Sequence, residues 1–267
     1  MSMSKSLPNF SNPPLDEVVL GVQFDPCPNY SSIFAKDVWE LYCEEFPSTA
    51  EHQALSPQFE VFGGHNPQSG FQVNFGQAPV RSRLWFISKE QNHLLQFQDD
   101  RLLLNWRRYP NGQEYPRFEQ IAKDFNDYLI RLKNFFQEKF EFAMKINQAE
   151  VSYINNIPID NYSDISDWFS FWNDNQLKID GLSTNFIEVI NDVDNQPFAR
   201  LTHELSSVIS AEDGKKAFQF ALSFRGKPDG EDVESGMKFI REGRKKIVVR
   251  FCEATTKEAQ KKWEKGE

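Results

Sequence analysis

The spacing of apolar residues changes within residues 83 to 136, from the short period of strands to the longer period of a helix. Three strands are predicted: one that opens at Trp85, one over His93 to Gln98 and one over Arg101 to Arg107. Asp99-Asp100 separates the last two strands and has the length that favours a tight hairpin. The apolar residues that follow step by three and four: Phe118, Ile121, Phe125, Leu129, Leu132 and Phe136. This stripe predicts an amphipathic helix that covers a sheet.

Upstream of this stretch, the pattern predicts a strand over residues 15 to 24 and then a shorter helix. Ser31 or Ser32 is a suitable cap for that helix, which is expected to end before Pro47. The predicted apolar face of this helix consists of Ile33, Phe34, Val38, Leu41 and Tyr42. Residues 48 to 80 are weakly patterned, with a short strand expected at residues 71 to 75.

After residue 140 the same order of elements is predicted again. A strand or two is expected over residues 142 to 157, then a short helix over residues 164 to 173 with Ser163 as its cap. Three more strands are predicted over residues 186–190, 198–209 and 217–224. A second long helix is expected to begin near Glu231, and its predicted buried stripe consists of Met237, Ile240, Ile247, Val248 and Phe251. Thr255 and Glu258 form a predicted capping box for a terminal helix that ends around Trp263.

These elements predict an α+β protein with two similar halves, residues 14 to 140 and residues 141 to 267, preceded by a flexible arm of residues 1 to 13. Each half is a strand, a helix, three or four antiparallel strands and a long helix. This order is similar to that in the halves of the TATA-box-binding-protein fold and, more loosely, in helix-grip domains. The two sheets are expected either to join edge to edge or to pack side by side.

Several motifs resemble, in the same order along the chain, those of a sporadically distributed family of prokaryotic proteins of about this length, for which no function is assigned. The motifs are Pro14-Leu15-x-Glu17-Val18-Val19, Leu95-Gln96-x-x-Asp99-Asp100-Arg101, Asn105-Trp106-Arg107-Arg108, Tyr115-Pro116-x-Phe118-Glu119, Val151-x-Tyr153-Ile154-Asn155-x-Ile157, and Phe251-x-x-x-Thr255-Thr256 followed by Trp263. One departure is Arg244, where that family often has a His. The patchy distribution implies genes that move between genomes, as components of defence or toxin–antitoxin loci do.

Composition adds an aromatic excess and an acidic balance. The chain of 267 residues contains 25 Phe, and aromatic residues make up 14% of it, which predicts an aromatic core or, alternatively, an aromatic pocket or partner groove. We find no apolar run of about 18 residues and no signal peptide. Three widely spaced Cys without a CxxC motif favour a reducing cytoplasm. A net charge of -9 does not favour general nucleic-acid binding, although residues 238 to 250 are locally basic.

The sequence contains none of the common catalytic, phosphate-binding or metal-binding motifs, so no enzyme activity, cofactor or metal is predicted. Gly63-Gly64-His65 is interpreted as a turn. His203 and Glu204 are neighbours in a predicted strand, so their side chains are expected on opposite faces of the sheet, where they cannot share one metal ion. A pair of carboxylates remains open, because 39 acidic residues leave many candidates.

Two clusters are candidate binding residues. The first consists of Trp106, Arg107, Arg108 and Tyr109. One interpretation is that its arginines contact a phosphate, a base or a carboxylate of a partner. The alternative is that Trp106 packs under the long helix while the arginines pair with acidic neighbours. The second is Lys238, Arg241 and Lys245, which share one face of the second long helix. That face is either simply solvated or docks an acidic partner or a nucleic-acid backbone.

The leading prediction is therefore a non-catalytic binding or adaptor protein of the cytoplasm that recognises another protein, in a locus of the defence or toxin–antitoxin type. The alternative is a sensor that binds nucleic acid or a small ligand through the sheet faces and the basic helix. A deep, polar cavity between sheet and helix would count against the adaptor function. The oligomeric state stays open.

Overall fold

The computed structural model describes residues 7–62, 82–108, 114–173, 177–210 and 214–266. Its strands are β1 (Leu15–Phe24), β2 (Ser48–Gln53), β3 (Ser82–Ile87), β4 (His93–Gln98), β5 (Arg101–Arg107), β6 (Ile146–Ile159), β7 (Ser183–Asn191), β8 (Pro197–Ile209) and β9 (Lys216–Gly226). Within the described ranges these form one nine-stranded antiparallel sheet in the order β2-β3-β4-β5-β1-β6-β9-β8-β7. The α+β class is thus confirmed.

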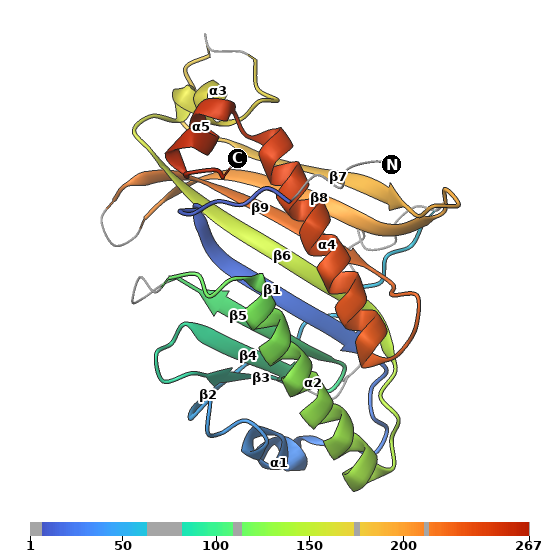
Figure 1. Cartoon of the computed structure of the whole chain (residues 1–267). Coiled ribbons are helices and arrows are strands. Elements are labelled where there is room, and N and C mark those ends of the chain that lie inside the picture. Colours follow the sequence, from blue (N-terminus) through green and yellow to red (C-terminus); the bar gives the residue numbers. More distant parts are fainter. Residues whose placement is uncertain (1–6, 63–81, 109–113, 174–176, 211–213, 267) are drawn as a thin grey trace, which may run out of the picture.

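Two long helices cross the same face of this sheet (Figure 1). They are α2 (Phe118–Phe140), which contacts β5, and α4 (Val233–Ala254), which contacts β6 and β9. The shorter helical segments are η1 (Ser32–Phe34), α1 (Ala35–Glu40), η3 (Tyr162–Asp164), α3 (Ile165–Trp168) and α5 (Lys257–Lys262). No helix in the described part of the chain is long and apolar enough to cross a membrane.

The spacing of apolar residues along α2 and α4 determines which face of each long helix packs on the sheet. All six residues of the predicted α2 stripe are buried against the sheet. In α4, the predicted stripe is buried except for Val248, which is half-buried. The backbone of α4 also comes very close to the sheet at Gly243: a Cβ there would lie 2.4 Å from Phe224 Cδ1 and 2.7 Å from Val151 Cγ1. A glycine is needed at this position because any side chain would push α4 away from β6 and β9.

The strands that precede residue 140 and those that follow it join edge to edge. Strand β1 pairs with β6 in antiparallel register, so that Leu20 lies opposite Val151, and the sheet runs on without a break. The predicted bounds of β1, β4 and β5, and the hairpin at Asp99-Asp100, agree with the structure. The predicted aromatic core is present too: most of the largest fully buried side chains are phenylalanines.

Local predictions failed where tertiary contacts compete with the pattern. The first predicted helix is a 3-10 turn followed by a short helix, and Ile33, assigned to its apolar face, is 80% exposed. The predicted helix over residues 164 to 173 is only the four-residue α3, and the cap of the preceding turn is Asn161, whose side chain accepts from the Ser163 N–H. The cap of α5 is Thr256 instead of Thr255. The predicted strand at residues 71–75 and the turn at Gly63-Gly64-His65 lie outside the described residues.

The described part of the predicted N-terminal arm contacts the other end of the chain. Phe10 is buried and forms a β-bridge with Lys265, while Ser11 N–H donates to Glu264 O at 3.1 Å. The Phe10 ring packs edge-on against Phe251 of α4, with 5.7 Å between the ring centroids. These contacts place residues 8 to 13 beside α4, where they form one wall of the cavity described next.

The sheet face opposite the long helices is polar and is crossed by residues 55 to 61. Leu55 N–H donates to Gln98 Oε1 at 2.8 Å, and Gln58 N–H donates to Gln23 Oε1 at 3.0 Å. At the far side, Arg200 of β8 binds the Glu60 carboxylate and the Val61 carbonyl. This face is therefore partly covered by the protein's own chain.

Candidate functional site

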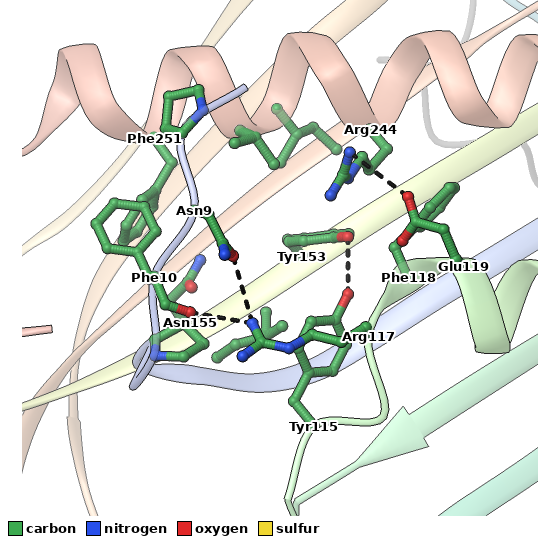
Figure 2. Close-up of a pocket in the computed structure, with 15 residues that line it drawn as sticks. Asn9, Phe10, Tyr115, Arg117, Phe118, Glu119, Tyr153, Asn155, Arg244 and Phe251 are labelled. Atoms are coloured by element: carbon green, nitrogen blue, oxygen red, sulfur yellow. Dashed lines mark hydrogen bonds and ion pairs between the residues drawn. The ribbon is translucent and has the colours of Figure 1, made fainter. Parts of the chain in front are cut away.

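A cavity of about 380 Å³ lies between the sheet and the helices, at the point where α2 begins (Figure 2). Four segments surround it: residues 8 to 15, residues 115 to 119, β6 and α4. Its lining residues are Pro8, Asn9, Phe10, Pro13, Leu15, Tyr115, Arg117, Phe118, Glu119, Tyr153, Asn155, Arg244, Ile247, Val248 and Phe251.

Arg117 holds two of these segments together. It is the residue before α2 and adopts a positive φ of 74°, which is uncommon for a residue with a side chain. Its guanidinium donates to Phe10 O at 3.0 Å and to Asn9 Oδ1 at 3.5 Å. The loop before α2 is thereby joined to the N-terminal segment. Strained backbone of this kind persists only where its surroundings hold it in place, and it is frequent at functional sites.

Two phenols meet on the sheet side of the cavity. Tyr115 Oη and Tyr153 Oη lie 3.0 Å apart and share a hydrogen bond. Burial raises the pKa of both phenols, and for Tyr153 this effect outweighs the opposing influence of the hydrogen bonds with Tyr115 and Arg244 and of the Arg244 charge. Both hydroxyls are therefore protonated at neutral pH. Since their mutual bond uses one hydroxyl hydrogen, the other is available to an acceptor in the cavity.

Arg244 supplies positive charge from α4. Its side chain is 23% exposed, and its Nε is buried without a hydrogen-bond partner among the described residues. The nearest carboxylate is that of Glu119, at 3.9 Å from Nη1, but the Glu119 side chain is 73% exposed, so this ion pair is weak. The guanidinium also lies 5.2 Å from the centroid of the Phe118 ring. Arg244 therefore places a positive charge beside the cavity and next to Tyr153.

The remaining wall is apolar. It consists of Leu15, Phe10, Ile247, Val248 and Phe251, most of which are buried. On the polar side, Asn155 is fixed by its Nδ2, which donates to Phe220 O at 3.1 Å. The cavity thus combines aromatic and aliphatic surface with convergent hydrogen-bond donors and a net positive charge from Arg117, Arg244 and Glu119. An apolar molecule with one acidic group matches this arrangement.

A groove between α2 and α4 shares part of this wall. Its volume is about 840 Å³, and Phe118, Glu119 and Arg244 line both the groove and the cavity. Of the predicted basic face, Arg241 and Lys245 line the groove. Lys238 lies elsewhere and pairs with Asp229 at 3.0 Å, where both side chains are exposed.

The first predicted cluster is divided between the two faces of the sheet. Trp106 is fully buried on the helix side, with its ring centroid 5.1 Å from that of Tyr115. On the other face, Arg107 Nε donates to Glu17 Oε1 at 3.0 Å. Arg108 donates to the backbone carbonyls of Leu15 and Pro13, at 2.9 and 3.1 Å. Tyr109 lies outside the described residues.

His203 and Glu204 lie on opposite faces of the sheet, as predicted. His203 is buried on the helix side, where it stacks on Phe186 and where its Nε2 lies 3.1 Å from Glu188 Oε1. Glu204 is exposed. Among the described residues, no three His, Cys, Asp or Glu side chains gather as a metal-binding group.

The cavity residues were not among the candidates predicted from the sequence. Tyr115, Tyr153 and Asn155 belong to motifs that carry the family resemblance, and Arg244 is the departure from it, so the motifs were the signal that pointed to this site. No protein-family model matches the chain, and comparison with curated proteins finds no match. The family resemblance therefore stays a prediction.

Proposed function

We propose that this protein is a non-catalytic, cytoplasmic sensor that binds a small organic anion in the cavity beside Arg244. The observation that carries the proposal is the Arg244 guanidinium, whose carboxylate partner Glu119 is distant and exposed, next to the hydroxyls of Tyr115 and Tyr153. A guanidinium without a close carboxylate favours an anionic ligand, because hydrogen bonds between charged partners are the strong ones.

The ligand class follows from the two sides of the cavity. A carboxylate or phosphate replaces the distant Glu119 as the partner of Arg244 and accepts the free hydroxyl hydrogen of the tyrosine pair. An apolar body fits against Phe10, Phe251 and the aliphatic residues of α4. The volume of about 380 Å³ is within the range of small-molecule sites.

Displacement of a fluorescent probe tests this proposal. Anilinonaphthalene sulfonate, itself an aromatic anion, is titrated into the protein and then displaced by octanoate or by octylamine, which differ mainly in the sign of the head-group charge. We expect octanoate alone to displace the probe. Arg244→Gln is expected to weaken octanoate binding by about tenfold or more, because a charge-assisted hydrogen bond is lost.

Lys246→Gln is the matched control, since Lys246 is an exposed cation of α4 that lines neither the cavity nor the groove. It is expected to bind octanoate like the wild type. Displacement by octylamine as effective as that by octanoate, or equal binding by the Arg244→Gln variant, would contradict the proposal.

We also propose that the two halves arose by duplication of a unit similar to half of the TATA-box-binding-protein fold. Outward from the central β1–β6 pair, the first half contributes β1, β5, β4 and β3, and the second contributes β6, β9, β8 and β7. In each half the last strand in sequence lies beside the first, and a long helix follows it. The idea is tested by superposing the four strands and long helix of the first half onto the four strands and long helix of the second. A mismatch of strand directions would refute it.

Recognition of another protein is the second candidate function. It is favoured by the unpaired cations of the groove between α2 and α4, which are considered next. A role in a defence-type locus depends on the family resemblance alone.

A further inference from the structure

The groove between α2 and α4 is long enough for a peptide segment. Its α2 side extends from Phe118 to Lys133, and its α4 side extends back from Lys245 to Asp232, so the two helices run in opposite directions along it. Figure 1 shows the two helices on the same face of the sheet. At the rise of an α-helix, residues 118 to 133 span roughly 22 Å, which equals about 15 residues of a docked helix.

One end of the groove is strongly basic. Lys123, Arg241 and Lys245 line it there, and none of these three forms an ion pair among the described residues. By contrast, Lys139 near the other end of α2 pairs with Asp37 at 2.9 Å. Three uncompensated cations on a chain of net charge -9 form a local surface of the opposite sign.

The floor of the groove is apolar. Phe118, Ala122, Val233 and Met237 form it and are themselves buried, while Ile130 stands at the rim with 42% of its surface exposed. The aliphatic stems of the lysines extend this surface, because such side chains cover apolar area while their charged ends stay in water. A bound segment therefore meets apolar contacts in the middle and cations at one end.

We propose that this groove docks an acidic amphipathic helix of another protein. The apolar side of such a helix lies on the floor, as in helix-in-groove recognition, and its carboxylates pair with Lys123, Arg241 and Lys245. A nucleic acid is a poorer match, because Glu119, Asp232 and Glu234 also line the groove and repel a continuous row of phosphates. This proposal goes beyond the cavity and does not require that the cavity bind a ligand.

Selection of peptides tests the docking site directly. A random library of peptides about 16 residues long, matched to the groove length, is selected on the full-length protein. We expect the recovered peptides to carry net negative charge, with apolar residues spaced by three and four. A synthetic copy of one such peptide, measured by fluorescence anisotropy, is expected to bind the Arg241→Glu, Lys245→Glu double variant at least tenfold more weakly than the wild type.

Lys246→Glu again serves as the control, because it reverses an exposed charge on the same helix outside the groove. It is expected to keep wild-type peptide affinity, and circular dichroism establishes that all variants fold. The proposal is overturned if no acidic peptide is recovered, or if the double variant binds the peptide as the wild type does. It is also overturned if labelled single-stranded or duplex DNA binds the groove in place of acidic peptides. The Tyr153→Phe variant is altered in the cavity and not in the groove, so it is expected to bind the peptide like the wild type. A failure of the peptide site is thereby distinguished from a failure of the ligand site.

Discussion

The phenol oxygens of Tyr115 and Tyr153 lie 3.0 Å apart and so connect the loop before α2 to strand β6. The two residues belong to different halves of the chain, and their contact is made beside the cavity that is also lined by Arg244. This hydrogen bond holds the entry of α2 against the centre of the sheet.

This hydrogen bond is expected to couple the two tyrosines energetically. Tyr115→Phe and Tyr153→Phe should each lower the free energy of unfolding by about 1 kcal/mol, and the double variant should lose little more, because each single change already breaks the bond. Urea denaturation of the four proteins measures this coupling. Strictly additive losses would show that the phenols do not interact.

The close approach of α4 to the sheet predicts opposite outcomes for two glycines of that helix. Gly243→Ala places a Cβ 2.4 Å from Phe224 Cδ1, so overpacking of about 1–3 kcal/mol is expected to exceed the helix-propensity gain of about 1 kcal/mol. At Gly236 the nearest atom is the flexible end of Ile146, at 3.0 Å. Gly236→Ala should therefore be neutral or slightly stabilising. Midpoints of urea unfolding compare the two variants, and a more stable Gly243→Ala protein would refute this packing argument.

Alanine substitutions of the two adjacent arginines at the end of β5 are expected to differ in their effects on stability and on anion binding. Arg107→Ala removes a half-exposed ion pair with Glu17 and should cost only about 0–1 kcal/mol, without effect on anion binding in the cavity. Arg108→Ala removes two charged hydrogen bonds to the carbonyls of Leu15 and Pro13, which line the cavity, and should cost about 1–3 kcal/mol.

Thermal unfolding and octanoate affinity, measured together, distinguish the two arginines. Arg108→Ala is expected to weaken octanoate binding as well as the fold. A loss of ligand or partner binding in the Arg107→Ala protein at unchanged stability would instead support the prediction that Arg107 contacts a partner.

The burial of His203 leads to a prediction of how the stability of the folded protein depends on pH. Burial lowers its pKa below the ordinary 6.5, and this outweighs the nearby Glu188 carboxylate, which acts in the opposite direction; Arg250 adds to the lowering. Because the unfolded chain then binds more protons than the folded protein, stability falls as the pH drops below about 6.5, by at most about 1.4 kcal/mol per pH unit for this group. Burial lowers the pKa of His93 as well, which adds to the same trend.

A His203→Gln variant should show a shallower loss of stability on acidification, since it lacks the buried imidazole and keeps only the half-buried one of His93. The free energies of unfolding of the wild type and the variant are compared between about pH 5 and about pH 8, a range that includes the ordinary histidine pKa of 6.5. A slope equal to that of the wild type would mean that His203 does not titrate between these limits.

Agreement between sequence and structure was best where a long stretch of chain repeats one period. The α2 stripe was predicted correctly, because a helix of 23 residues buries one face whatever its neighbours are. The bounds of β4 and β5 were also predicted correctly, since the Asp99-Asp100 turn separates two apolar runs that are buried on both faces. Short segments behaved differently: α3 has four residues where ten were expected, and Ile33 is exposed. In such segments a few tertiary contacts exceed local preference.

The same limit applies to the candidate site. The predicted cluster of Trp106, Arg107 and Arg108 is contiguous in sequence, yet the alternation of a strand sends Trp106 and Arg107 to opposite faces. The cavity instead joins residues far apart in the chain, such as Phe10, Tyr115 and Arg244. No local pattern marks residues that meet only after the sheet has formed.

The sequence by itself determined the α+β class, the edges of the main strands and the buried faces of both long helices, since these follow from the periods of strand and helix. Tertiary structure alone decided that β1 pairs with β6, that the N-terminal segment packs on α4 and that Arg244 faces two phenols. The reason is physical: periodicity fixes which side of an element is buried, whereas the partner on that side is set by packing between distant segments.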